Sequence, residues 1–600
     1  MIGLFGVSGP GCLSSENVRI PILSRMTTRV DKRDYSFRIE HMPHASIGIV
    51  YRNHGENKDI TLRKVTDQRL IAFNGYARLH KNGDYLWSST IIDFLSELNE
   101  RDIKKNLFAL AGSFECIIYD RDKIFLISDR FGSKKLFYAL HNGTFIFAPD
   151  IGIIVDAAII PKEKDLSATI QFLTSGFFIG DATLDKNIKR FPFGTLFERS
   201  LSPSLEDNFT RYWLPDPPID KLNTIDEDLI RNFTTTAERS ITSLVPLSDA
   251  ILMPLSAGLD SRAIACFLSS NHKDLTGLTY NLHDEVKIAK AVGNQLQFKK
   301  HILISKTQIA KSEFREFLYD NIQENYSHSV LNQYFYTYFF KKLLRDQIDY
   351  ECIYDGIYLG LLFSAPYTYE DFSFDRFQNI YCRGVNALSL FSSCLDAKQI
   401  SESPRNAYEN LISEFGLSDQ RDGIKISTLF YLAGRLRRYV AESYHSREDY
   451  GYVFKPGFDY DLVDFGYRLG LPIRKGKLYR EMYKKVFPDT YQITYKDSYG
   501  NRGKTLGEII KSKYVSSRKK LNTATKGMIP YYSSQTEYFF YHRKELEKLE
   551  AYFSNKSYIP EIFSENDLRR LFELTKEKTY LLNFFQRVLM LQSFFKRFNY

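Results

Sequence analysis

The sequence predicts an α/β protein of two domains, the first rich in β-strands and the second built on a parallel sheet. Over the first 200 residues, short runs of alternating apolar residues recur between turn signals. After residue 250, strands and helices alternate, as in sheets whose parallel strands are joined by helices. Between the two patterns lies a proline-rich stretch, YWLPDPPID (212–220), which we predict to be the linker.

The individual elements follow from these patterns. In the N-terminal part, the strand pattern occupies residues 45–51, 69–79, 113–120, 123–129 and 143–149. In the C-terminal part we expect, in order, a strand at 250–255, a helix at 261–270, a strand at 276–282, a helix at 284–296 and a strand at 299–304. From about residue 306 to the end, the chain is predicted to be mostly helical.

Length and composition describe a globular chain outside the membrane. At 600 residues, the chain is longer than one ordinary domain. No apolar run reaches the ~18 residues of a membrane-spanning helix. The N-terminus lacks the basic segment of a signal peptide. The six cysteines have neither metal-ligand spacing nor the arrangement of a disulfide framework, so we expect reduced thiols and a cytoplasmic protein. From the lack of a long apolar run we expect no membrane insertion.

The net charge of +9 is concentrated near the C-terminus. Residues 501–600 contain 19 Lys and Arg against 10 Asp and Glu, notably in KSKYVSSRKKLNTATKG (511–527). A solvated helical face is the simplest interpretation. A basic surface that attracts an acidic substrate or partner is the alternative. A nucleic-acid partner is disfavoured, because no motif that reads nucleic acid accompanies the charge.

The most informative motif follows the first strand of the C-terminal domain. Residues 256–261 read Ser-Ala-Gly-Leu-Asp-Ser and lead into a helix. This order is typical of the pyrophosphate-binding loop of enzymes that split ATP between its α and β phosphates. Small residues such as Gly258 let backbone N–H groups approach phosphate oxygens, and the helix N-terminus adds a favourable dipole. The hydroxyls of Ser256 and Ser261 can donate hydrogen bonds, and Asp260 can hold Mg²⁺. A plain serine-glycine turn that caps the helix is the alternative.

Several segments resemble the asparagine synthetase superfamily, in the order in which its members carry them. They are LAGSFECIIYDRDKIFLISDRFGSKKLFY (110–138), GFFIGDATLDKNIKRFPFGTLFE (176–198), RYWLPD (211–216) and FDYDLVDFGYRLGLP (458–472). The resemblance implies an Ntn-hydrolase-like αββα sandwich of the class II amidotransferase type over residues 1–215. Over 222–600 it implies an ATP-pyrophosphatase domain, similar to adenine nucleotide alpha hydrolases, with a parallel sheet, helical additions and the basic C-terminal region.

The N-terminal domain departs from the family where glutaminase chemistry takes place. A glutaminase of this type needs Cys as the first residue of the mature chain, because the thiol attacks the amide and the α-amine is the base. Here Ile2 follows the initial Met, and nothing indicates a cleavage that would expose Cys12. The glutamine-anchoring Arg is also missing from residues 45–48. We therefore expect no glutaminase activity, and we expect the retained Asn74-Gly75 to be a hairpin turn or a strand end.

The segment KLYREMYKKVFPDTYQITYKDSYGNRG (477–503) carries the sharpest resemblance in the C-terminal domain. Family members place an Arg, then a Pro eight residues later, then the catalytic Lys eight residues after that. Here the series is Arg480, Pro488 and Lys496. The resemblance makes Lys496 the candidate catalytic cation, placed where negative charge builds in the transition state. An ordinary surface lysine is the alternative.

The second metal-binding loop of the family is altered. Members read G-E-G-S-D-E or a close variant, whereas residues 354–360 here read Tyr-Asp-Gly-Ile-Tyr-Leu-Gly. If Gly356 aligns with the first glycine near the pyrophosphate, Gly360 replaces the metal-binding Asp. Asp355 is then a candidate metal ligand if the loop shifts. Tyr358 is a candidate base, as a Tyr of this loop is in the related β-lactam synthetases. A simple turn at Asp355-Gly356 is the alternative, and both interpretations stay open.

The resemblance implies an ATP- and Mg²⁺-dependent carbon–nitrogen ligase that forms AMP. The substrate carboxylate would be adenylated and passed to an amine or ammonia, either to cyclise a peptide, as in lasso-peptide cyclases, or to amidate a small or sugar acid, as in proteins of polysaccharide clusters. A partner protein supplying the substrate is compatible with this. The alternative is a non-catalytic scaffold or nucleotide-binding subunit of a biosynthetic complex. The sequence leaves the acyl donor and the amine acceptor open.

Overall fold

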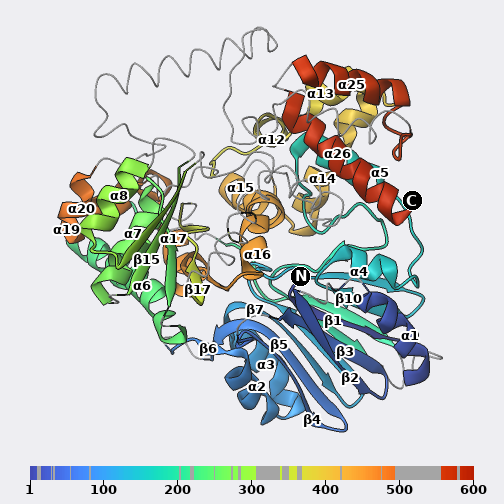
Figure 1. The fold of residues 1–600 in the computed structure, drawn as a ribbon, viewed down its shortest axis with the longest axis horizontal. Coiled ribbons are helices and arrows are strands. Elements are labelled where there is room, and N and C mark those ends of the chain that lie inside the picture. Colours follow the sequence, from blue (N-terminus) through green and yellow to red (C-terminus); the bar gives the residue numbers. More distant parts are fainter. Residues whose placement is uncertain are drawn as a thin grey trace.

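The fold was examined in a computed structural model (Figure 1). The structure describes residues 1–9, 15–28, 30, 34–53, 56–79, 83–201, 205–216, 222–248, 250–271, 274–281, 286–305, 338, 340, 350–360, 368–418, 422–474, 476–493, 556–577 and 581–600. Lys496, Cys12 and the basic segment 511–527 lie outside these ranges, so the predictions made for them stay predictions. Within the described ranges, no helix is both long enough and apolar enough to span a bilayer.

The N-terminal part contains two antiparallel sheets that face each other. The first has the strand order β11-β9-β10-β1-β3-β2, and its strands are β1 (Gly3–Ser8), β2 (Tyr35–Met42), β3 (Ala45–Arg52), β9 (Phe137–His141), β10 (Thr144–Ala148) and β11 (Lys189–Arg190). The second has the order β13-β12-β8-β7-β5-β4 with β6 paired to β5, and its strands are β4 (Ile60–Thr66), β5 (Arg69–Arg78), β6 (Leu86–Trp87), β7 (Ala111–Asp120), β8 (Lys123–Ser128), β12 (Thr195–Ser200) and β13 (Glu206–Arg211). The five strands predicted here are confirmed.

Helices cover the outer faces of both sheets (Figure 1). One side carries α2 (Ser88–Ser96) and α3 (Glu100–Ala109), and the other carries α1 (Glu16–Thr27) and α4 (Ile151–Asp156). Every residue of β7 is buried, because successive side chains alternate between the two faces. Ile117 and Tyr119 belong to the core between the sheets, whereas Cys116 and Ile118 pack under the helices. The predicted four-layer αββα sandwich is therefore present.

The C-terminal part contains a parallel sheet with the strand order β16-β15-β14-β17-β18. Its strands are β14 (Ile251–Pro254), β15 (Leu275–Asn281), β16 (Lys300–Ser305), β17 (Cys352–Tyr354) and β18 (Tyr452–Phe454). Three helices flank them: α6 (Glu227–Thr242), α7 (Leu259–Asn271) and α8 (Val286–Gln295). The predicted strands and helices between residues 250 and 305 are confirmed, and so is the fold class. The short strands β17 and β18, which complete the sheet, were not predicted.

Most other regular structure in the described residues is helical, and the prediction of a mostly helical chain after about residue 306 is confirmed for the described part of that region. The α-helices not yet named are α5 (Leu166–Ser175), α12 (Phe374–Tyr381), α13 (Val385–Phe391), α14 (Ala397–Glu414), α15 (Gly423–Phe430), α16 (Ala441–Glu448), α17 (Tyr460–Arg468), α18 (Leu471–Arg474), α19 (Lys477–Val486), α20 (Pro488–Gln492), α25 (Glu565–Glu577) and α26 (Leu582–Phe598). A π-helical segment, Tyr431–Val440, joins α15 to α16. The C-terminal helix α26 returns to the N-terminal part, where Arg587 donates to the carbonyls of Leu173 and Thr174.

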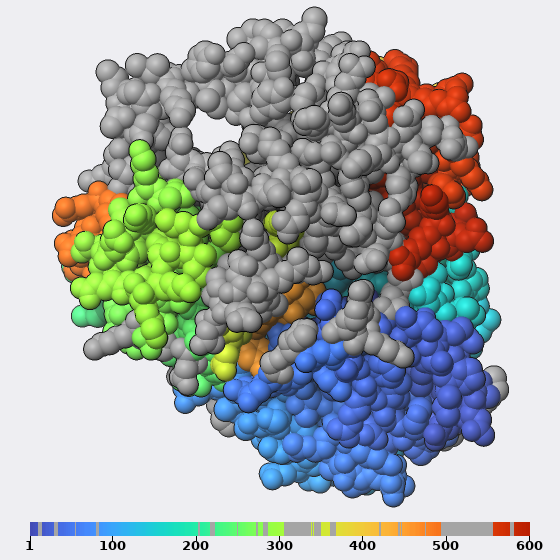
Figure 2. All heavy atoms as spheres, in the orientation of Figure 1, coloured from blue at the N-terminus to red at the C-terminus, as the bar shows by residue number. Residues whose placement is uncertain are grey.

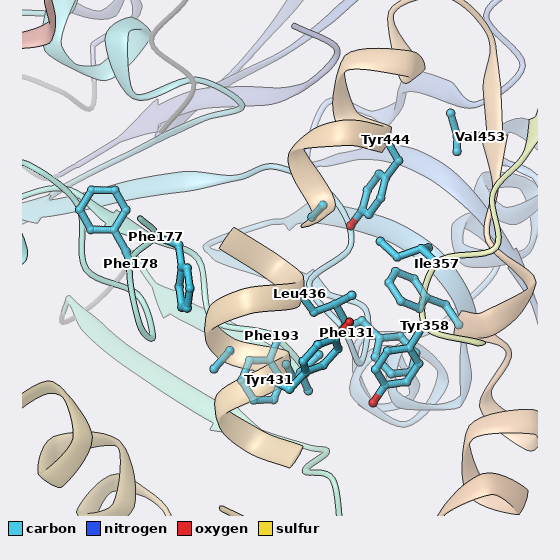
Figure 3. Close-up of a cluster of buried hydrophobic side chains, with 14 of the residues drawn as sticks. Phe131, Phe177, Phe178, Phe193, Ile357, Tyr358, Tyr431, Leu436, Tyr444 and Val453 are labelled. Carbon is cyan, nitrogen blue, oxygen red and sulfur yellow. The ribbon is translucent and has the colours of Figure 1, made fainter. Parts of the chain in front are cut away.

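An apolar cluster joins the two parts of the molecule (Figure 3). Phe131 of the sandwich stacks on Phe458 with ring centroids 4.6 Å apart and lies 5.3 Å from the ring of Tyr358. Figure 2 shows the resulting arrangement, with the sandwich in blue and the parallel-sheet part in green and orange directly beside it. Because this contact buries large aromatic rings, it fixes the position of the loop that carries Tyr358.

A buried ion cluster lies at the same junction. The carboxylate of Glu448 on α16 accepts hydrogen bonds from Lys134 of the sandwich at 3.0 Å and from Lys455 at 2.8 Å. Burial opposes ionisation of Glu448, but the charges of Lys134 and Lys455 outweigh it and hold the pKa of that carboxyl well below its usual range. Lys455 also donates to Ser113 on β7 at 3.0 Å, so one cluster connects both halves.

Candidate nucleotide-binding site

The candidate site begins at the carboxyl end of β14, the central strand of the parallel sheet. Open parallel sheets bind ligands at this edge. The chain leaves the strand at Leu255, whose N–H donates to the carbonyl of Leu278 at 2.8 Å and whose carbonyl accepts from the Thr279 hydroxyl at 2.7 Å. These bonds extend the pairing with β15 by one residue. The loop that follows therefore starts from a fixed point, and α7 begins at Leu259.

Hydrogen bonds within the loop link its two serines. The Ser256 and Ser261 hydroxyls lie 2.9 Å apart, and the Ser261 hydroxyl accepts from the Ser256 N–H at 3.1 Å. The Gly258 N–H donates to the Ser256 hydroxyl at 3.1 Å. Ser256 is exposed, whereas Gly258, Asp260 and Ser261 are half-buried. The four predicted residues thus form one compact turn whose polar groups reach solvent at the N-terminus of α7.

The loop at residues 355–360 lies against this turn, as the resemblance implied. A Cβ atom added to Gly356 would lie 3.7 Å from Asp260 Cβ and 3.8 Å from the Ser261 nitrogen. A Cβ atom added to Gly360 would lie only 2.9 Å from Asp260 Oδ2. Gly360 therefore occupies the position from which a second carboxylate would face Asp260. The absence of a side chain at Gly360 lets the two loops approach this closely.

Asp355 makes contacts on the other side of its loop. One carboxylate oxygen accepts from the Ile357 N–H at 3.0 Å, and the other forms an ion pair with the guanidinium of Arg447 on α16. Arg447 is itself buried. This geometry favours the turn interpretation of Asp355-Gly356, because both carboxylate oxygens already have partners. A metal-binding role for Asp355 stays a prediction that requires the loop to shift.

Tyr358 is part of the apolar junction in Figure 3. Its side chain is buried, and its hydroxyl lies 2.6 Å from the hydroxyl of Tyr467. Burial, with the neighbouring Tyr467, raises the pKa of the Tyr358 phenol well above its usual value. A phenol whose pKa is raised stays protonated near neutral pH, so hardly any phenolate is present to act as a base. The Tyr358 ring also packs against Phe131 and Phe458. The geometry describes an interface residue, and the base role stays a prediction.

Helices α19 and α20, which precede Lys496 in the sequence, pack against α7. Arg262 in the first turns of α7 is fully buried, and its Nη1 donates to the carbonyl of Thr490 at 3.1 Å and to that of Ile493 at 2.9 Å. The Arg480 and Pro488 positions of the predicted series lie on α19 and at the start of α20. Lys496 follows three residues after Ile493, outside the described residues, and its catalytic role stays a prediction.

The donor set fits Mg²⁺ bound together with a nucleotide. Mg²⁺ takes one or two protein carboxylates and completes its shell with water and phosphate oxygens. Asp260 supplies one half-buried carboxylate beside the serine hydroxyls. Among the described residues, no group of three or more His, Cys, Asp or Glu residues could form an all-protein metal site. A Mg²⁺ ion held at Asp260 would take its remaining ligands from water and phosphate oxygens.

The N-terminal sandwich contains a second polar cluster, built around Glu115. Glu115 Oε1 accepts from the Asn74 side-chain amide at 3.0 Å and from the Leu4 N–H at 3.1 Å, which connects the two sheets. Asn74 and Glu115 are both about 2% exposed or less. Burial raises the pKa of Glu115 to about 7. Ile2 stands directly before β1 and packs against the core between the sheets.

The prediction that Asn74-Gly75 forms a hairpin turn or strand end is wrong. Both residues lie inside β5, which pairs with β4 on one side and β7 on the other. Gly75 has a φ of 124°, and a Cβ atom there would lie 2.0 Å from the Ser113 carbonyl oxygen. The glycine is thus needed for a close approach between strands. The local Asn-Gly pattern resembles a turn, but pairing on both sides overrides it.

Comparison with known proteins agrees with this architecture. Residues 76–213 match the family described as a glutamine amidotransferase domain. A segment of 188 residues is 26% identical to asparagine synthetase (glutamine-hydrolyzing) 2 of Bacillus subtilis (strain 168), and the match covers 28% of this chain and 24% of that protein. The chain is therefore similar to an asparagine synthetase over part of its length. It spans about a quarter of the curated relative's length, and the family match begins after Ile2 and Asn74-Gly75.

Solved structures offer weaker likenesses. Glutamine phosphoribosylpyrophosphate amidotransferase from B. subtilis, complexed with ADP and GMP, has 8% identity and a TM-score of 0.24, and the match covers 51% of this chain and 91% of that one. NMN synthetase from Francisella tularensis has 12% identity and a TM-score of 0.18, with 37% of this chain and 95% of that one covered. Scores this low carry no argument about function.

Proposed function

We propose that this chain is an ATP-dependent carbon–nitrogen ligase that adenylates a substrate carboxylate and has no glutaminase activity of its own. The observation that carries the proposal is the paired loop arrangement at the end of β14. Two serine hydroxyls and one carboxylate stand at the N-terminus of α7, and a second glycine-containing loop lies against them. Hydroxyls and backbone donors at a helix N-terminus favour phosphate groups.

The proposed reaction has two steps. A carboxylate oxygen of the substrate forms a bond to the α-phosphorus of ATP, and the bond to the bridging oxygen breaks, so pyrophosphate leaves with the electron pair. The nitrogen of an amine or ammonia then attacks the acyl carbon of the adenylate. The carbon–oxygen bond to AMP breaks, and the nitrogen loses a proton. AMP is a better leaving group than hydroxide, which is why activation makes amide formation possible.

This chain's own residues bind and orient the phosphates. Ser256 and Ser261 would donate hydroxyl hydrogen bonds, and the first N–H groups of α7 would face the same anion. Asp260, which faces the backbone at Gly356, would hold Mg²⁺. The bound Mg²⁺ would offset the negative charge of the phosphates. Lys496 would supply a fixed cation where negative charge grows in the transition state. Donors held in advance stabilise that charge without reorganisation during the reaction.

The nitrogen source follows from the state of the N-terminal site. The Asn74 side-chain amide donates to the buried Glu115 inside the sandwich. Ile2 offers no thiol. Ammonia from solution, an amine on a partner-delivered substrate, or an amine within the same substrate would then be the nucleophile. Peptide cyclisation and amidation of a small or sugar acid are both compatible with this chemistry.

Pyrophosphate release tests the proposal. The full-length chain would be mixed with Mg²⁺, ATP and ammonium, and pyrophosphate would be measured after addition of amino acids, uronic acids or short peptides as separate carboxylate pools. We expect release that depends on one class of carboxylate and that is accompanied by an equal amount of AMP. Release of phosphate and ADP instead would contradict adenylation.

A non-catalytic relative is the second candidate, and one observation favours it. Gly360 provides no second carboxylate beside Asp260, and the nearby Asp355 already pairs with Arg447. A chain of this kind would bind ATP and act as a nucleotide-dependent subunit of a biosynthetic complex. Binding of ATP without pyrophosphate release, in the presence of the substrate classes above, would favour this candidate over the ligase.

A further inference from the structure

Two tyrosines of α19 pack against the residue that begins α7. Tyr479 and Tyr483 are both buried and stand four residues apart, so they share one face of their helix. Both hydroxyls donate to the carbonyl oxygen of Leu259, at 3.3 Å from Tyr479 and 3.2 Å from Tyr483. Leu259 directly precedes Asp260. The two hydroxyls therefore fix the peptide unit that carries the candidate metal ligand.

The two tyrosines differ in their other partner. The Tyr479 hydroxyl is also a hydrogen-bond partner of the Asp260 carboxylate, so its single proton is shared between that carboxylate and the Leu259 carbonyl. The Tyr483 hydroxyl instead has the thiol of Cys266, on the buried face of α7, as its second partner. Burial and the charge of Asp260 raise the pKa of Tyr479 well above its usual value. Of the two tyrosines, Tyr479 is therefore the one that contacts the Asp260 carboxylate.

The contact with Tyr479 matters because it limits the orientation of the Asp260 carboxylate. Oδ2 of Asp260 faces Gly360 of the second loop, at 2.9 Å from the position of an added Cβ atom. A carboxylate on a short side chain can rotate unless a second group holds it. Carboxylates that bind metals are themselves hydrogen-bonded by outer groups, and the loss of such a group commonly weakens metal binding by ~10–100-fold.

We infer that Tyr479 is a positioning residue that holds the Asp260 carboxylate in the orientation in which it binds the divalent cation of a metal–nucleotide complex. The inference rests on the proposed function, because it takes Asp260 as the metal ligand. It adds a residue that lies on α19, outside both loops. Tyr483 provides a matched comparison, since it has the same acceptor, the same helix face and similar burial, but a different second partner.

The test compares Tyr479→Phe with Tyr483→Phe in the full-length chain. ATP binding would be measured by calorimetry at increasing Mg²⁺ concentrations, and again with EDTA to remove the metal. We expect Tyr479→Phe to raise the Mg²⁺ concentration for half-maximal binding by ~10-fold and to leave metal-free ATP binding unchanged. We expect Tyr483→Phe to stay within about twofold of the parent. In an Asp260→Asn background, Tyr479→Phe should add little, because the two residues act through one contact.

Other results would overturn the inference. Equal shifts in the two Phe variants would show that the tyrosines only support the helix junction. A parent-like Mg²⁺ dependence in Tyr479→Phe would show that Asp260 needs no such support. A parent chain whose ATP binding does not depend on Mg²⁺ would instead overturn the metal role of Asp260 in the proposed function, and this inference with it. Circular dichroism of each variant ensures that folded protein is compared.

Discussion

The two polar clusters of this molecule differ in how their groups are used. In the sandwich, Glu115 accepts hydrogen bonds from the Asn74 amide and from the Leu4 N–H, and Asn74 and Glu115 are both almost completely buried. In the parallel-sheet domain, the hydroxyls of Ser256 and Ser261 bond to each other, but Ser256 is exposed and Ser261 is half-buried. The first cluster links two sheets inside the protein. The second presents its donors to solvent at a helix N-terminus.

This difference assigns different roles to the two halves. A buried group with a fixed internal partner contributes to the fold, and a ligand cannot use it without breaking that contact. A partly exposed group at the edge of a parallel sheet can exchange its water or internal partner for phosphate oxygens. The comparison therefore predicts that nucleotide chemistry depends on the β14–α7 loop. It also predicts that changes around Glu115 affect stability rather than catalysis.

The largest effect is expected for Asp260→Ala. Removal of the carboxylate takes away the candidate Mg²⁺ ligand and leaves phosphate charge without compensation. Pyrophosphate release should fall below detection, and binding of Mg-ATP should weaken by ~10²-fold or more. Asp274→Ala is the control, because that exposed carboxylate pairs with Lys299 on the surface of the same domain. If Asp260→Ala binds Mg-ATP as tightly as the parent, the loop assignment is wrong.

A slightly smaller effect is expected for Lys496→Ala. Loss of one positioned electrostatic donor commonly lowers a rate by ~10²–10³-fold. Amide formation should fall by that factor while the circular dichroism spectrum and melting temperature stay those of the parent. Lys484→Ala serves as the control, since Lys484 pairs with Glu481 on the surface of α19. Full activity in Lys496→Ala, or a variant that fails to fold, would contradict the role drawn from the Arg480–Pro488–Lys496 spacing.

Glu115→Gln tests the prediction that the buried cluster of the sandwich affects stability and not catalysis. Because the pKa of Glu115 in the folded chain is raised from 4.5 to about 7, its protonation favours the folded state at low pH. That contribution is lost as the pH rises from about 4.5 to 7. Gln does not titrate, and its amide nitrogen can replace Oε2, which has no hydrogen-bond partner among the described residues. The variant should exceed the parent in stability at pH 8, by about 1–3 kcal/mol, and lose this advantage near pH 5.

Denaturant unfolding at the two pH values measures this difference. The exposed Glu163 provides the control, since Glu163→Gln should shift stability little at either pH. Pyrophosphate release by Glu115→Gln should equal that of the parent. A variant that is less stable than the parent at pH 8 would mean that the ionised carboxylate, and not the neutral one, holds the two sheets together.

Much of this architecture was predictable because its patterns are local. The alternating runs of the sandwich and the strand–loop–helix at residues 251–271 each carry their periodicity within a few residues. Continuous burial of β7 follows from layers on both faces. The positions of Ser256, Gly258, Asp260 and Ser261 on one turn likewise follow from the order of residues in the loop.

Other features depend on contacts between distant segments. Strands β17 and β18 have three residues each, and only the pairing of β17 with β14 and of β18 with β17 distinguishes them from loops. Asn74-Gly75 resembles a turn until β4 and β7 are placed on either side of it. Tyr479 and Tyr483 are four residues apart, and this helical spacing could have predicted that they share one face of α19. Their acceptor, Leu259, lies more than 200 residues away.

One reaction mixture tests the central claim, that chemistry takes place at the β14–α7 loop and not in the sandwich. The full-length chain would be incubated with Mg²⁺, ATP, radiolabelled pyrophosphate and isotopically labelled glutamine, together with a small-molecule carboxylate extract of its source cells. Label in ATP and release of glutamate would be followed together. We predict that label enters ATP, that Asp260→Ala abolishes this exchange, and that glutamate does not form. Glutamate release at a rate comparable to the exchange, or glutamate release without any exchange, would contradict the account.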